Sequence, residues 1–70
     1  MYRNLEAELA RNGITKTNVA AELGLTLGTL SLKLNGKSNL TLPEAIKIKT
    51  IIGGNLSLEY LFQVNEEIKN

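Results

Sequence analysis

Four glycine-containing stops divide this 70-residue chain into short segments, and they constrain the fold more than any other feature of the sequence. The stops lie at Asn12-Gly13, Gly24, Asn35-Gly36 and Gly53-Gly54. Glycine readily adopts the left-handed backbone conformation in which many helices end, and it destabilises the interior of a helix. A chain interrupted this often cannot form a long helix, so its elements must be short and must pack against one another.

Apolar residues recur at helical spacing within the segments. Leu5 and Leu9 are four residues apart, and Leu27, Leu30 and Leu34 share one face of a helix. A threonine or serine that can cap a helix precedes each of the later segments. We predict helices over about residues 2–11, 16–23, 27–34, 42–52 and 58–62, followed by a polar tail over residues 63–70.

Two short runs, residues 40–42 and 46–49, alternate between apolar and polar side chains as strands do. The sequence Thr41-Leu42-Pro43-Glu44 decides against strands. Threonine and glutamate three residues apart form a capping box at the start of a helix, where the missing N–H of proline costs nothing. In a strand, the same proline cannot donate to the ladder. The sequence therefore predicts an all-α fold of five helices.

The length of the chain allows one small domain, which we expect to span residues 1–70. The absence of cysteine and histidine excludes disulfides, thiolate nucleophiles and zinc fingers. Nothing in the sequence groups the carboxylates, lysines and tyrosines with a nucleophile or a metal ligand, so we expect no enzyme activity, cofactor, metal or small-molecule ligand. No apolar run approaches the roughly 18 residues of a membrane span. We therefore expect a cytoplasmic protein without a membrane partner.

Charge is distributed unevenly, although the net charge is only +1. Between residues 9 and 43, four cationic side chains stand against the single carboxylate of Glu22, a balance of +3. After Gly53, Lys69 stands against three glutamates, a balance of −2. The middle of the chain is therefore basic and its C-terminal end acidic, although a net charge this close to zero does not by itself indicate a nucleic-acid partner. Counts this small also fit charges scattered over a solvated surface.

The two predicted helices around Gly24 meet the requirements of a helix-turn-helix. Ala20 is small enough for the helices to cross closely, Gly24 accepts the tight turn, and Leu25 and Leu30 fill the angle between them. Four stretches then resemble, in order and spacing, the lambda-repressor-like, Cro/C1-type helix-turn-helix domain of small phage and prophage regulators. They are residues 16–26 (KTNVAAELGLT), 29–37 (TLSLKLNGK), 41–48 (TLPEAIKI) and 56–62 (LSLEYLF). The resemblance covers about residues 2–62.

The resemblance implies a transcription regulator that binds a double-stranded DNA operator. In this family the third helix lies in the major groove, and the second crosses the phosphate backbone. By position, the groove-facing candidates are Leu27, Gly28, Thr29, Ser31, Leu32 and Lys33. Lys16 stands at the phosphate-binding position of the family, and the other implied DNA contacts are Thr17, Thr26 and Lys37.

Several of these positions depart from the family pattern. Leu27, Gly28 and Leu32 stand where the family commonly has Gln, Arg, Ser or Glu, whose side chains read bases through hydrogen bonds. Three interpretations are open: the leucines contact thymine methyl groups in a readout based partly on DNA shape, they form an apolar patch that binds a protein, or Leu27 packs in the core. A further departure is Lys33, because the family places a core residue at this position.

A second set of candidate residues lies near the C-terminus and is apolar: Leu58, Leu61, Phe62, Val64 and Ile68. We expect them to form a self-association surface, because one domain with so few basic contacts binds DNA weakly. The same residues can instead close the core of the monomer. We therefore predict a DNA-binding regulator that acts as a homodimer. The alternative is a protein-binding module, of an antirepressor or assembly type, that uses Leu27 and Leu32.

Overall fold

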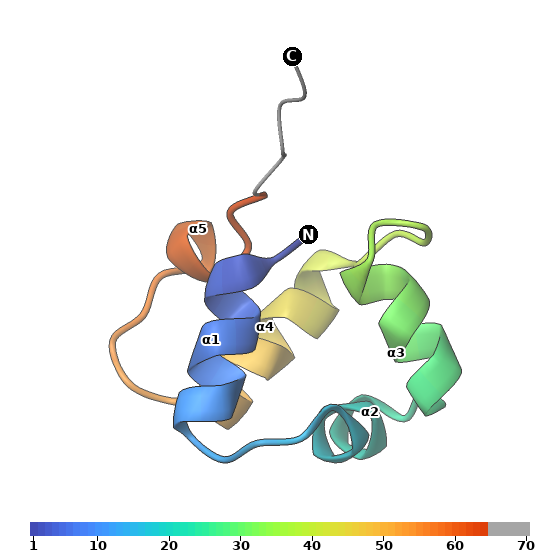
Figure 1. Ribbon diagram of the computed structural model, residues 1–70, viewed down its shortest axis with the longest axis horizontal. Helices are drawn as coiled ribbons and strands as arrows, with labels where there is room; N and C mark the ends of the chain where they lie inside the picture. Colours follow the sequence, from blue (N-terminus) through green and yellow to red (C-terminus); the bar gives the residue numbers. More distant parts are fainter. Residues whose placement is uncertain (65–70) are drawn as a thin grey trace.

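Five α-helices follow one another in the computed structural model, which describes residues 1–64 (Figure 1). They are α1 (Arg3–Arg11), α2 (Lys16–Leu23), α3 (Leu27–Leu34), α4 (Leu42–Ile52) and α5 (Leu58–Leu61). No strand occurs in this part of the chain, so the predicted all-α class is confirmed. The predicted bounds differ from the observed ones by one residue at the start of α1 and at the end of α5. Within residues 1–64, no helix is both long enough and apolar enough to cross a membrane.

Side chains that cap the first free N–H groups set the start of four of the helices. Thr15, Thr26, Thr41 and Ser57 each accept a hydrogen bond from the backbone N–H three residues further along the chain. At Thr41 the predicted capping box is complete, because Oε1 of Glu44 accepts the Thr41 N–H at 2.9 Å. These helices therefore begin where the local sequence places them.

A short turn joins α2 to α3, and Gly24 makes it possible. Gly24 has a φ of 71°, in the left-handed region where a residue with a Cβ atom is strained. The Leu25 N–H donates to the carbonyl oxygen of Ala20 at 2.9 Å, which ends α2 and turns the chain toward α3. Ala20 itself is buried, and α2 and α3 pack against each other. The sequence around Gly24 thus fixes the angle between two short helices.

The core draws on all five helices. Its largest fully buried side chains are Leu5, Val19, Leu30, Ile48 and Leu61, one from each helix. In Figure 1, α4 runs through the middle of the molecule, and it packs against α2 and α5. α1 packs against α5, which brings the two ends of the described chain together. Leu61 therefore belongs to the core of the monomer, which corrects its predicted place on a self-association surface.

The carboxylate of Glu8 on α1 is buried, with only 4% of the residue exposed. Its Oε2 accepts a hydrogen bond from the Arg11 guanidinium at 2.7 Å and another from the Tyr60 hydroxyl at 2.9 Å. A buried carboxylate needs such partners, because an unpaired charge away from water is costly. The contact with Tyr60 joins positions 52 residues apart in the sequence, so it fastens α5 to α1.

Because of the hydrogen bond between Tyr60 and Glu8, the free energy of unfolding is expected to depend on pH in the alkaline range. The hydrogen bond to Glu8, together with desolvation, raises the pKa of Tyr60 above its usual value. Because the folded-state pKa is the higher one, the contact stabilises fully below about pH 10 and is lost as the pH rises through the folded-state value. We expect the free energy of unfolding to fall more steeply in alkali for the parent than for Tyr60→Phe, as measured by urea denaturation at successive pH values. Parallel curves would contradict the link between Tyr60 and Glu8.

Candidate nucleic-acid interface

α3 lies at the edge of the molecule opposite α5, and its main packing partner is α2 (Figure 1). Its inward face carries the buried side chains of Leu30 and Leu34. Three other residues of α3 are exposed: Leu27, one turn before Leu30, which is 47% exposed, Gly28, and Leu32, which is 48% exposed; we call these three residues the outward face of α3. The exposure of Leu27 rules out the interpretation that it packs in the core. The outward face of α3 is therefore largely apolar.

The hydroxyl groups of α3 supply little hydrogen-bonding capacity to this face. Thr29 and Ser31 are half-buried. The Thr26 hydroxyl is used by the helix cap, since it accepts the Thr29 N–H at 3.1 Å and donates to Oγ1 of Thr29 at 2.9 Å. Thr26 is thus the N-cap residue of α3.

Lys33 does not reach the outward face. Its ammonium donates to the carbonyl oxygen of Asn39 at 2.8 Å and lies 3.2 Å from Oε1 of Glu44. Only 12% of the Lys33 side chain is exposed, so the charge is held within the turn between α3 and α4. This corrects the prediction that Lys33 faces the groove. The long Lys33 side chain is directed by its contacts with Asn39 and Glu44. Helical spacing alone does not predict these contacts.

The partners of Glu44 keep its carboxylate charged. The hydrogen bond from the Thr41 N–H, followed by that from Lys33, holds the pKa of Glu44 below its usual value, although burial acts in the opposite direction. The ion pair between Lys33 and Glu44 is therefore present at neutral pH.

Two exposed lysines flank the pair of helices α2 and α3. Lys16, the first residue of α2, lies 3.3 Å from Oε1 of Glu6, and the two side chains are 43% and 46% exposed. An ion pair this exposed contributes about 1 kcal/mol at most, so a phosphate can replace the Glu6 carboxylate. Thr17 is exposed beside Lys16, and Lys37 is exposed in the turn after α3. Their contact with DNA phosphates stays a prediction.

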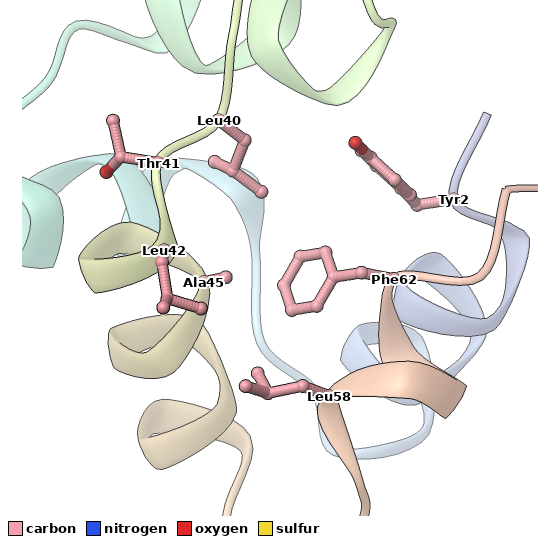
Figure 2. A pocket seen from close by; sticks show the side chains of 7 residues that line it. All are labelled: Tyr2, Leu40, Thr41, Leu42, Ala45, Leu58 and Phe62. Atoms are coloured by element: carbon pink, nitrogen blue, oxygen red, sulfur yellow. The ribbon is translucent and has the colours of Figure 1, made fainter.

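Two of the residues predicted for self-association, Leu58 and Phe62, line an apolar pocket with a volume of about 280 Å³. Figure 2 shows their side chains facing Ala45 of α4 across the pocket. The other lining residues are Tyr2, Leu40, Thr41 and Leu42. Val64 is 44% exposed, whereas the predicted Ile68 lies outside the described residues. An apolar surface is thus present near the end of the described chain, without Leu61.

α4 exposes two large apolar residues that are not among the candidate site residues predicted from the sequence. Leu42 is 64% exposed at the rim of the pocket, and Ile46 is 47% exposed. Their four-residue spacing places them on one face of the helix. This spacing is visible in the sequence, but it is also the spacing of core residues.

Comparison with protein-family models, with curated proteins and with solved structures finds no match to the chain. The candidate interface is therefore interpreted from its own chemistry.

Proposed function

We propose that the protein is a DNA-binding transcription regulator of the lambda-repressor-like helix-turn-helix type, with α2 and α3 as the two helices. The observation that carries the proposal is the exposed outward face of α3, an edge helix whose angle to α2 is fixed by the turn at Gly24. A helix with its side chains is about 10–12 Å across, and the major groove of B-DNA is about 12 Å wide. α3 can therefore enter the groove while α2 crosses the phosphate backbone.

The exposed side chains divide into phosphate contacts and base contacts. Lys16 and Lys37 bring positive charge to the phosphates on either side of the groove and fix the orientation of the protein. Leu27 and Leu32 contact thymine methyl groups, while the half-buried hydroxyls of Thr29 and Ser31 add at most a minor contact with base edges. Such a surface favours an operator rich in A·T pairs, with part of the specificity coming from DNA shape.

We expect the regulator to act as a homodimer on a pseudo-palindromic operator. Two α3 helices would then enter successive major grooves about 34 Å apart. One copy supplies few phosphate contacts, and each further contact strengthens binding. Leu58 and Phe62, which line the apolar pocket, and the exposed Val64 two residues after Phe62 supply apolar area that can join two copies in a symmetric contact.

A protein-binding module is the second candidate, and the position of Lys33 favours it. Because Lys33 is turned into the molecule, the surface of α3 that exposes Leu27 and Leu32 carries one positive charge fewer than the sequence suggests. Exposed apolar patches on small proteins mark contacts with other proteins. In this alternative the outward face of α3 binds a partner protein, and DNA plays no part.

Salt titration of DNA binding tests the proposed phosphate contacts. Each lysine that neutralises one phosphate contributes about 0.9 to the slope of log affinity against log salt concentration. We expect Lys16→Ala and Lys37→Ala each to lower this slope by about 0.9 per bound copy, with the preferred DNA sequence unchanged. Lys47→Ala is the matched control, because Lys47 is exposed on α4 and lies outside the pair α2 and α3. Slopes equal to that of the parent in both variants would show that neither Lys16 nor Lys37 contacts a DNA phosphate.

A further inference from the structure

Lys33 ties together the turn between α3 and α4. Lys33 is the second-to-last residue of α3. Its ammonium donates a hydrogen bond to the Asn39 carbonyl oxygen and forms an ion pair with the Glu44 carboxylate in the first turn of α4. Both side chains are largely buried, with 12% of Lys33 and 20% of Glu44 exposed. We call these three groups, the Lys33 ammonium, the Asn39 carbonyl and the Glu44 carboxylate, the Lys33 latch.

The segment that the latch encloses carries Lys37. The backbone N–H groups of Lys37 and Ser38 both donate to the carbonyl oxygen of Leu32, at 2.9 and 3.2 Å. These two hydrogen bonds hold the start of the turn to α3, while the latch holds its end at Asn39. The exposed Lys37 side chain lies at the first of these attachments, two residues before the second.

We propose that Lys33 is a positioning residue: through Asn39 and Glu44 it orders the turn of residues 35–39, and thereby places the Lys37 ammonium for its phosphate before DNA arrives. This inference rests on the proposed function, in which Lys37 contacts the DNA backbone. A turn that is already ordered avoids the entropic cost of ordering it on binding. The Lys33 ammonium itself does not contact DNA, because its charge is turned away from solvent and is already paired.

Replacement of Glu44 by glutamine distinguishes positioning of Lys37 from simple electrostatics, because the two predict opposite changes in the affinity for DNA. Glutamine can still complete the capping box, so α4 keeps its start, but the ion pair with Lys33 is lost. If only charge mattered, removal of a carboxylate would strengthen binding to DNA. If the latch positions Lys37, Glu44→Gln weakens binding. We expect Glu44→Gln and Lys33→Met each to bind about two- to five-fold more weakly, as for the loss of one ion pair, with the salt slope of the parent.

Glu22→Gln is the matched control, because it removes the same charge from an exposed position on α2. We expect it to bind DNA at least as tightly as the parent. Binding of Glu44→Gln as tight as that of the parent or tighter, or a fall of the salt slope by about 0.9 in Lys33→Met, would overturn the inference.

Amide hydrogen exchange of the DNA-free protein tests the latch independently of the proposed function. We expect faster exchange at the N–H groups of Lys37 and Ser38 in Lys33→Met and Glu44→Gln, with exchange in α1 unchanged and with Glu22→Gln like the parent. Unchanged exchange at both amides would overturn the inference even if DNA binding fell. If the parent bound no DNA, both the proposed function and the phosphate contact of Lys37 would be refuted. The exchange rates would still show whether the Lys33 latch orders the turn.

Discussion

Truncation of Leu61 to alanine is expected to lower the free energy of unfolding by about 2–5 kcal/mol. Leu61 is 0% exposed and belongs to the core cluster that also contains Leu5 and Ile48. Alanine removes the buried methyl groups and leaves a cavity, because the surrounding helices relax only in part. Natural domains are stable by only about 5–15 kcal/mol, and small ones lie toward the lower end. The loss is therefore a large part of the total stability.

Urea denaturation at two protein concentrations measures this effect and separates a core residue from a dimer contact. A core residue destabilises equally at both concentrations, whereas a residue of a dimer surface has an effect that depends on concentration. Val64→Ala is the control, because Val64 is 44% exposed and surface substitutions usually change stability by less than about 0.5 kcal/mol. If Leu61→Ala unfolded at the urea concentration of the parent and only failed to dimerise, its placement in the core would be wrong.

Enlargement of Ala20 to leucine is expected to destabilise the protein by about 1–3 kcal/mol. Ala20 is 3% exposed on α2, and its carbonyl oxygen accepts the Leu25 N–H of the turn that leads into α3. A larger side chain at this position has no free volume, so it must push α2 and α3 apart or adopt an unfavourable rotamer. The angle on which the outward face of α3 depends would then change together with stability.

The neighbouring position supplies the control for this experiment. Ala21 lies on the same helix and is exposed, so Ala21→Leu makes the same chemical change without overpacking and should stay near the stability of the parent. Thermal melts of the two variants side by side give the comparison. Equal melting temperatures for Ala20→Leu, Ala21→Leu and the parent would show that α2 and α3 do not cross closely at Ala20.

Local signals predict the helices of this protein well. The caps at Thr15, Thr26, Thr41 and Ser57 and the stop at Gly24 act through residues at most four positions away, so the sequence alone indicates where the helices begin and end. The buried face of α3 is also predictable, because Leu30 and Leu34 are one helical turn apart.

Contacts between distant segments account for what the sequence does not predict. The partners of Lys33 depend on how the turn before α4 folds back, and Tyr60 meets Glu8 across 52 positions of sequence. The spacing of apolar residues near the C-terminus is the same whether they fill the core or form a contact between two copies. Periodicity therefore does not distinguish the buried Leu61 from the exposed Val64. The packing of α5 on α1 and α4 distinguishes them.

Selection of binding sites from a random pool of double-stranded oligonucleotides, with the parent and Leu32→Gln side by side, tests the DNA-binding proposal most directly. Leu32 is 48% exposed on α3, so glutamine there should leave the fold intact while it adds donors and acceptors that can read adenine. We expect the parent to enrich a palindromic motif rich in A·T pairs. In Leu32→Gln we expect a changed base at one position of each half-site, on the scale of about 1–3 kcal/mol per base pair. Failure of the folded parent to enrich any motif at low salt would contradict the proposal and favour the protein-binding alternative.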